Sequence, residues 1–141
     1  MICFECGNIL SDDFRSNGTF GVFLCETHQN IMDVVFKKLG GHSDIGRFYF
    51  ALKKLGLDPF IGWWNGERRV PIAFGRYRLN LEFYDTNLPH DHSLALKRQQ
   101  IESYDHQRQF ICLHIPLALL EDHLTHTALL IHNIHEGLRA Y

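Results

Sequence analysis

The feature that most constrains this chain is a pattern of three cysteines and one histidine in its first thirty residues. Cys3 and Cys6 form one pair with two residues between them, and Cys25 and His28 form a second pair with the same spacing. This spacing lets both side chains of a pair reach one metal ion, and two such pairs complete the tetrahedral coordination of zinc. Because four protein ligands leave no open coordination position, the pattern predicts a structural zinc site rather than a catalytic one.

The alternative interpretation is a disulfide or a set of free buried thiols. The N-terminal residues contain no basic segment followed by an apolar one, so they do not resemble a secretory signal, and we expect an intracellular, cytoplasmic protein. Disulfides are rare in that compartment, which favours zinc. The turn with Gly7 after Cys6, the predicted strand over 19–24 and the predicted helix over 27–39 together resemble a treble-clef or LIM-like finger. Modules of that type bind either nucleic acid or protein.

Gly40 and Gly41 end the predicted helix, so we place the boundary of the zinc-binding module there, with residues 1–40 before it and an α/β domain over 41–141 after it. Asn65-Gly66 predicts a type I′ hairpin within this second domain. Apolar spacing predicts elements in the order α-β-β-β-α-β-α: a helix capped by Ser43 over 44–55, strands over 59–64, 68–74 and 78–84, a helix over 92–104, a strand over 110–115, and one long helix from Pro116 as its first residue to about 138.

Composition narrows the functional classes. Hydrophobic residues make up 45% of the 141 residues, which is enough for a buried core and excludes a disordered chain. The longest apolar run, over 110–120, is too short to span a bilayer, so we expect no membrane partner. The net charge of −2 argues against tight non-specific binding of polyanions, although residues 37–108 carry twelve basic and eight acidic side chains. A mildly basic centre is compatible with phosphate contacts and is also typical of ordinary surfaces.

Four stretches of the second domain carry a resemblance to a known family. They are residues 43–52 (SDIGRFYFAL), 65–74 (NGERRVPIAF), 79–84 (LNLEFY) and the segment from Leu96-Lys97-Arg98 through 111–116 (ICLHIP). In this order they resemble the opening helix, the central hairpin, the catalytic strand and the following helix and strand of the PD-(D/E)XK nuclease superfamily, chiefly its small variants related to very-short-patch repair endonucleases. The resemblance covers about residues 43–138 and implies a restriction-endonuclease-like α/β fold.

The resemblance also implies which residues would perform catalysis. Members of the superfamily hold one or two Mg²⁺ ions by an Asp of the hairpin and by the Glu of the strand motif, and the ions activate a water for attack on the phosphate. Here the strand motif keeps Glu82, but the hairpin Asp position is Pro71 and the third motif position is Tyr84. The acidic position of the opening helix falls near Gly46. Three of four positions depart from the pattern, which favours a domain that keeps the fold without the catalysis.

Two interpretations of Glu82 remain open at the level of sequence. An active, Mg-dependent nuclease would use Glu82 and Asp85 in a rearranged site, with His90, Asp91 and His92 close by; Asp91 is otherwise a good N-cap for the helix after it. Alternatively, Glu82 is a solvated carboxylate on the hydrophilic face of a strand. We expect Cys112 to be a core residue, and we expect surface positions for four histidines of the last helix: His123, His126, His132 and His135.

Our leading hypothesis is therefore a zinc-containing, nuclease-like protein that binds nucleic acid and does not cut it. Trp63 and Trp64 would offer rings for base stacking. The side chains assigned to phosphate contacts are Arg68, Arg69, Arg76, Arg78, Lys97 and Arg98. The alternative from another class is a protein-interaction module, in which the acidic ends and the finger form a docking surface and the tryptophans belong to the core or to the interface.

Overall fold

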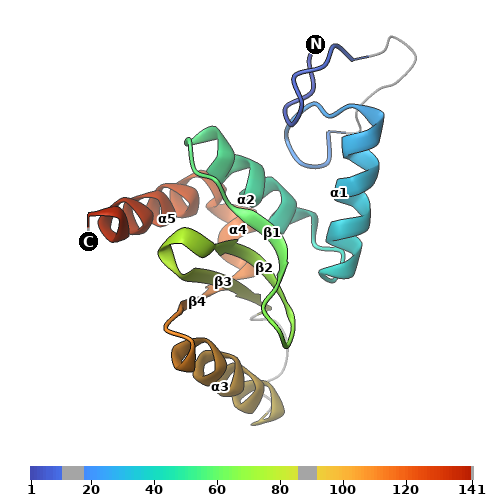
Figure 1. Cartoon of the computed structure of the whole chain (residues 1–141). Helices are drawn as coiled ribbons and strands as arrows, with labels where there is room; N and C mark the ends of the chain where they lie inside the picture. The colour runs from blue at the N-terminus through green and yellow to red at the C-terminus, as the bar shows by residue number, and fades with distance from the viewer. Residues whose placement is uncertain (11–17, 86–91, 141) are drawn as a thin grey trace.

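The computed structural model describes residues 1–10, 18–85 and 92–140 (Figure 1). Within these residues the chain is a mixed α/β structure with five α-helices and one four-stranded sheet. No helix in the described part is long and apolar enough to cross a lipid bilayer. The elements are α1 (Glu26–Lys38), α2 (Ser43–Lys54), β1 (Phe60–Trp64), β2 (Arg69–Phe74), the short 3₁₀ helix η1 (Gly75–Tyr77), β3 (Leu79–Tyr84), α3 (His92–Gln107), β4 (Ile111–Pro116), α4 (Leu117–Asp122) and α5 (Leu124–Arg139).

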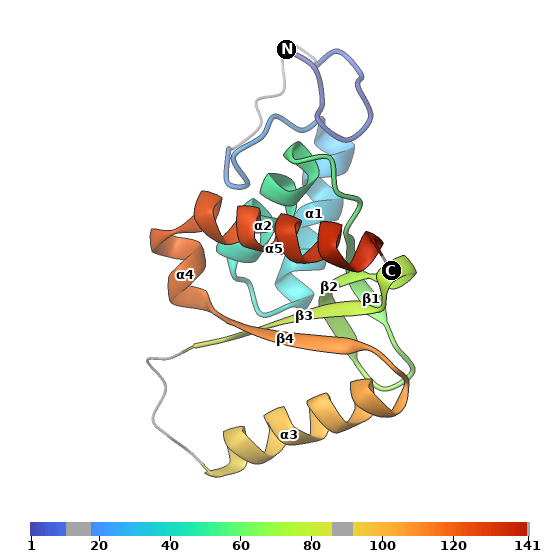
Figure 2. The same cartoon turned by 90° about the vertical axis from the view of Figure 1, so that its left-hand side faces the viewer.

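The sheet has the strand order β1-β2-β3-β4. The first three strands form an antiparallel meander, and β4 lies parallel to β3, in register from Leu79 opposite Ile111 to Tyr84 opposite Pro116. A parallel neighbour requires a crossover connection, which α3 supplies. Figure 2 shows the result: α3 lies against one face of the sheet, while α2, α4 and α5 lie against the other.

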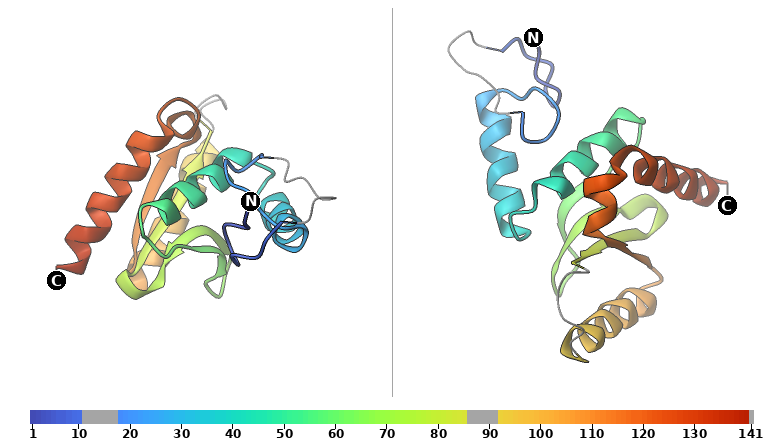
Figure 3. Two further views of the ribbon diagram at one scale, coloured as in Figure 1. Left: turned by 90° about the horizontal axis from the view of Figure 1, so that it is seen from above. Right: turned by 180° about the vertical axis from the view of Figure 1, so that it is seen from behind.

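The main core fills the space between the sheet and the helices α2, α4 and α5. Phe48 and Leu52 of α2 are fully buried there, as are Leu79 and Leu81 of β3. The same hydrophobic cluster continues into the N-terminal residues, where its members are Cys3, Phe20, Val22, Leu24, Met32 and Phe36. Figure 3 shows α1 and the N-terminal segment beside α2 and far from α3. One continuous core therefore crosses the expected module boundary at residue 40.

Two expected elements of the chain differ in the structure. The last helix is broken at His123 (φ −138°, ψ 43°), so that α4 and α5 are separate helices that both contact α2 and each other. Pro116 is the N-cap of α4 in extended backbone, not its first helical residue. The expected strand over 19–24 is not formed, since these residues make turns and irregular backbone; the alternation of Phe20, Val22 and Leu24 reflects their burial instead.

Two turn and cap predictions are off by one residue. Ser43 is the first residue of α2, and His42 is its N-cap. The hairpin between β1 and β2 exists, but its turn centres on Gly66 and Glu67, and of these two only Gly66 has a positive φ (102°). Asn65 precedes the turn, and its side-chain oxygen accepts hydrogen bonds from the backbone N–H groups of Glu67 and Arg68, each at 2.9 Å. The asparagine therefore acts by side-chain bonding rather than by adopting a left-handed backbone.

Candidate functional site

The four predicted metal ligands come together at the N-terminal end of the molecule. Their ligand atoms, the Sγ atoms of Cys3, Cys6 and Cys25 and a ring nitrogen of His28, all lie within 4.8 Å of one another. A tight loop presents the first pair: the N–H of Gly7 donates to the carbonyl of Cys3 at 2.9 Å, and Gly7 has the positive φ (74°) that this turn requires. The second pair is presented by α1, because Cys25 is its N-cap and His28 lies in its first turn.

The spacing between these atoms is close to that expected around a tetrahedral zinc ion. Sγ of Cys25 lies 3.2 Å and Sγ of Cys3 lies 3.6 Å from Nδ1 of His28, and the Sγ atoms of Cys6 and Cys25 are 4.0 Å apart. Tetrahedral zinc with bonds of about 2.3 Å to sulfur and about 2.0 Å to nitrogen places neighbouring ligand atoms about 3.5–3.8 Å apart. The predicted cluster is therefore confirmed as a group that can hold a metal ion, and its three thiols and one imidazole suit zinc.

The environment of Cys3 favours the thiolate that metal binding needs. Burial of this side chain, which is 1% exposed, acts to raise its pKa. Hydrogen bonds from the backbone N–H groups of Cys25, Cys6 and Glu5 outweigh burial and lower the pKa of Cys3 to about 6. A thiolate rather than a thiol is the ligand form of cysteine, so this geometry prepares Cys3 for a cation.

The metal-ligand loop is tied directly to α2. Nζ of Lys53 donates to Oε1 of Glu5 at 2.8 Å, and Glu5 lies between the first two ligands. Burial is the largest single effect and disfavours the charge on Lys53, but the hydrogen bond to Glu5 and the interactions with Tyr49 together outweigh it and raise the lysine pKa. The ring of Phe4 packs edge-on against Phe50 of α2, with centroids 5.6 Å apart. The candidate metal centre therefore anchors the N-terminal segment onto the first helix of the α/β part.

A second polar cluster lies on the other side of the sheet, at the position of the expected catalytic strand. Glu82 of β3 is 9% exposed, so the interpretation of a solvated carboxylate is wrong. Its Oε1 accepts a hydrogen bond from Nε of Arg68 at 3.1 Å and contacts Nη2 of the same guanidinium. That Nη2 also donates to Oδ2 of Asp105, a buried carboxylate of α3, at 3.4 Å. Burial raises the pKa of Glu82, and the charge of Arg68 limits the rise.

Two neighbouring residues of β4 complete this cluster without forming a nucleophile. Sγ of Cys112 lies 3.6 Å from Nε2 of His114, which lies 3.2 Å from a carboxylate oxygen of Glu102. Burial raises the pKa of the Cys112 thiol far above its usual range, and burial also lowers the pKa of His114. Both groups are therefore neutral near pH 7, whereas a reactive cysteine needs a depressed pKa and a charged partner.

The remaining catalytic positions of the family pattern have other neighbours. Pro71 lies within the part of β2 that pairs with β1 and is half-buried, while the ring of Tyr84 lies 4.4 Å below the guanidinium carbon of Arg98. Gly46 of α2 lies against the buried ring of Phe20, and a side chain there would collide with it. Asp85 follows β3 and is half-buried. His90 and Asp91 lie outside the described residues, as does the side chain of His92, so neither the metal cluster nor the N-cap expected there is tested.

The six basic side chains assigned to phosphate contacts fall into two groups. Arg68 is the internal partner of Glu82 and Asp105, whereas the other five are exposed: Arg69, Arg76, Arg78, Lys97 and Arg98. The two tryptophans also differ in their exposure to solvent. Trp63 stacks on Phe110 with centroids 5.4 Å apart, and Trp64 is 56% exposed on β1, opposite Arg69 in the register of the hairpin.

Sequence reasoning missed three polar residues that the structure buries. Asp105 gave no signal, because the rest of α3 is mostly polar and exposed. Asn80 lies two residues before Glu82 and so on the same face of β3. Its buried side-chain amide has no hydrogen-bond partner within the described chain. His135, expected at the surface, is 8% exposed and packs edge-on against Phe74 and Tyr77.

Comparison with known proteins identified no relative. Neither a protein-family model, nor a curated protein, nor a solved structure matches this chain.

Proposed function

We propose that this protein binds nucleic acid on a nuclease-like α/β scaffold that has lost catalysis and that a structural zinc ion stabilises. The antiparallel meander of β1, β2 and β3, followed by a parallel β4 reached through α3, supports a nuclease-like scaffold. The three-thiol, one-imidazole cluster supports zinc, because soft thiolates select it over hard cations such as Mg²⁺.

The loss of catalysis is inferred from the burial of Glu82 and from its ion pair with Arg68. A nuclease metal site needs carboxylate oxygens that are free to bind a hard cation together with water. Here Arg68 binds the Glu82 carboxylate and reaches Asp105 as well. A fixed guanidinium positive charge at this point repels a divalent cation, and Pro71 offers no side-chain ligand in the neighbouring strand. The cluster therefore acts as an internal ion pair that joins the β1–β2 hairpin, β3 and α3.

The surface beside this ion pair suits a phosphate backbone. The hydroxyl of Tyr104 donates to the backbone carbonyl of Asn65 at 3.0 Å, so the tip of the β1–β2 hairpin is held against α3. Arg69 and Trp64 of the hairpin are exposed, and so are residues 93–100 in the first half of α3, which include Lys97 and Arg98. Basic side chains with one exposed aromatic ring are the combination that single strands and unpaired bases bind.

Salt dependence of binding tests this proposal. Each phosphate contact adds about 0.9 to the slope of log affinity against log salt concentration for duplex DNA and about 0.7 for single strands. We expect fluorescence anisotropy with labelled DNA and RNA to show steep weakening with salt. The double variant Arg69→Ala/Arg98→Ala should reduce the slope by about 1.5. Arg47→Ala, which removes an exposed arginine paired with Asp44 on α2, is the matched control and should leave the slope unchanged. Binding that does not depend on salt would refute the proposal.

A cleavage assay separates this proposal from an active nuclease. The zinc-loaded protein is incubated with Mg²⁺ or Mn²⁺ and with single- and double-stranded DNA and RNA, beside a Glu82→Gln variant. We expect no cleavage above the variant. Cleavage that Glu82→Gln abolishes would show that Glu82 leaves Arg68 to bind a metal, with Asp85 as the second ligand expected from the sequence. If the protein retains no nucleic acid and instead co-purifies with one specific protein, the interaction-module alternative replaces both.

A further inference from the structure

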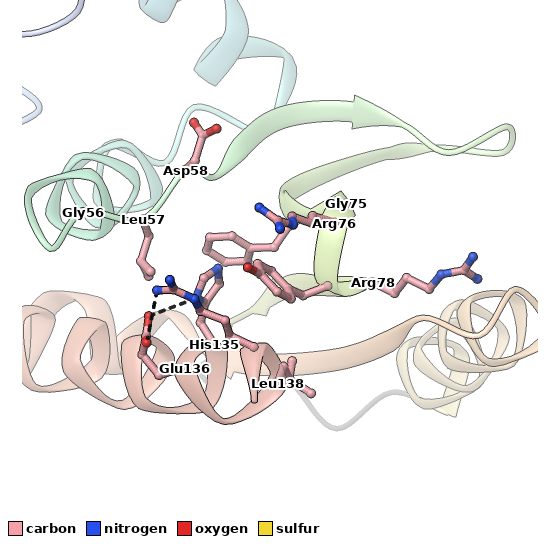
Figure 4. A pocket seen from close by; sticks show the side chains of 12 residues that line it. Gly56, Leu57, Asp58, Gly75, Arg76, Arg78, His135, Glu136 and Leu138 are labelled. Atoms are coloured by element: carbon pink, nitrogen blue, oxygen red, sulfur yellow. Dashed lines mark ion pairs between the residues drawn. The ribbon is translucent and has the colours of Figure 1, made fainter. Parts of the chain in front are cut away.

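A separate hollow lies at the end of the sheet where β2 turns into β3. It has a volume of about 800 Å³ and is bordered by the α2–β1 connection, by η1 and by the last turns of α5 (Figure 4). This volume is within the range of about 300–1,000 Å³ that small-molecule sites occupy. No residue of the metal centre or of the Glu82 cluster lines it.

The hollow has positive groups on two sides. Arg76 of η1 is exposed at its border, with its guanidinium carbon 5.6 Å from the centroid of the Tyr77 ring, and Arg139 borders it from α5. Figure 4 shows that Arg78 points away toward α3, where its Nη1 donates to the carbonyl of Arg108 at 3.3 Å. The carboxylate of Asp58 also points away from His135 and Glu136 in this view.

His135 adds an unused hydrogen-bonding atom to this wall. The residue is 8% exposed, and its Nδ1 is buried without a hydrogen-bond partner in the described chain. The ring is held edge-on by Phe74 and Tyr77, whose centroids are 5.1 Å and 4.5 Å away. A buried polar atom without a partner is unfavourable, so a ligand that accepts a hydrogen bond from Nδ1 stabilises this arrangement.

Glu136 marks where an anion fits. One of its carboxylate oxygens lies 3.7 Å from Nδ1 of His135 and the other lies 3.7 Å from Nη1 of Arg139. Both distances exceed hydrogen-bond length, so the carboxylate occupies this position loosely. The side chains of Glu136 and Arg139 are 43% and 66% exposed, and an exposed ion pair of this kind contributes little to stability. A stronger anion can therefore displace the carboxylate at small cost.

We propose that this hollow binds a phosphate group, which displaces the Glu136 carboxylate and takes up contacts with His135, Arg139 and Arg76. A phosphate carries more charge and more acceptor oxygens than a carboxylate, and charge-assisted hydrogen bonds from arginine are its usual recognition. The volume leaves room for an attached nucleoside beside the Tyr77 ring. The phosphate belongs either to a free nucleotide or to the end of a nucleic-acid strand; the second source rests on the proposed function, and the first does not.

The test uses the zinc-loaded protein and calorimetry with five probes. These are inorganic phosphate, adenosine, adenosine 5′-monophosphate, and one oligonucleotide with either a 5′-phosphate or a 5′-hydroxyl. We expect the phosphorylated oligonucleotide to bind about tenfold more tightly than the hydroxyl form, or the nucleotide to bind about tenfold more tightly than adenosine measured beside it. Arg76→Ala and Arg139→Ala should remove most of this difference. Glu136→Gln should strengthen phosphate binding because it removes the competing charge, and Arg47→Ala should change nothing.

The outcomes separate this proposal from the one above. Oligonucleotide binding that is indifferent to the 5′-phosphate and to Arg76→Ala, with no nucleotide binding, overturns the phosphate pocket and leaves nucleic-acid binding intact. Binding of the nucleotide without binding of any oligonucleotide supports the pocket and refutes the proposed function. Tighter binding to Glu136→Gln is a gain that a misfolded variant cannot produce, so this arm remains decisive if an alanine variant unfolds.

Discussion

Gly46 links the N-terminal segment to the α/β part, and replacing it with alanine tests that link. A Cβ atom at residue 46 would lie 2.6 Å from Cε1 of Phe20 and 3.0 Å from Cε2 of Phe36. The Phe20 ring is 4% exposed and is enclosed by Phe36 and Phe50, with centroids 4.9 Å and 6.0 Å away. Because close-packed rings have little room to move, the added methyl must displace Phe20 and the loop that carries it.

The magnitude follows from two opposing effects. Overpacking a close-packed core costs about 1–3 kcal/mol. Alanine has a helix propensity about 1 kcal/mol better than glycine, which offsets part of this cost in α2. Since the contact is far inside van der Waals distance, we expect Gly46→Ala to lower the free energy of unfolding by about 1–2 kcal/mol. With a urea slope of about 2 kcal/mol per molar, the unfolding midpoint should fall by about 0.5–1 M.

Urea unfolding in excess zinc provides the assay, and Gly137 provides a matched control. Gly137 lies in α5, and a Cβ there meets nothing within 4 Å. Gly137→Ala should therefore raise the midpoint slightly, the opposite sign to Gly46→Ala. In a Phe20→Ala background the contacts with Phe20 disappear and only the approach to Phe36 at 3.0 Å remains, so the cost of Gly46→Ala should fall to near zero or change sign. Equal midpoints for Gly46→Ala and Gly137→Ala would refute the proposed docking of Phe20 on α2.

Two further predictions concern the metal centre and the internal ion pair. The purified protein should contain about one zinc per chain by elemental analysis. Adding a chelator, or making the Cys6→Ser variant, should lower the melting temperature of the whole chain in one transition, because Cys3 and α2 share a core. Two separate melting transitions would contradict this. Arg68→Met should cost about 3–5 kcal/mol at pH 8, because it leaves Glu82 and Asp105 buried without compensation. Glu82 already has a raised pKa, so the folded state binds more protons than the unfolded state, and the loss should shrink as the pH falls toward 5. Arg68→Lys is the control that keeps the charge, and a pH-independent loss would count against the ion pair.

Short sequence patterns were sufficient to predict features that depend only on residues close together in the chain. The ligand pairs Cys3/Cys6 and Cys25/His28 each depend on a turn or on one turn of helix, and the structure brings all four side chains together. The order of helices and strands also followed from periodicity, since residue spacing alone determines which side chains share a face. The break at His123 could not be predicted, because the apolar stripe continues through it; in the structure both α4 and α5 contact α2.

The alternation of polar and apolar residues along a strand does not predict which element covers the polar face. Asn80 and Glu82 alternate with leucines, which is typical of a strand with one face in water. The structure instead covers that face with α3 and supplies a partner, Arg68, from the neighbouring hairpin. Glycine at residue 46 departs from the family pattern that the sequence resembles, and the structure shows a packing reason for it, because a side chain there would collide with the ring of Phe20.

The sequence by itself therefore determined the four candidate metal ligands and the α-β-β-β-α-β order, because these depend on residue type and short-range spacing. Only the tertiary structure decided that Glu82 is an internal ion-pair partner, that His135 lines a hollow and that the N-terminal segment shares a core with α2. Glu82 and Arg68 are 14 residues apart, and Arg68 and Asp105 are 37 apart. Contacts over such separations depend on how whole elements pack, which no local pattern encodes.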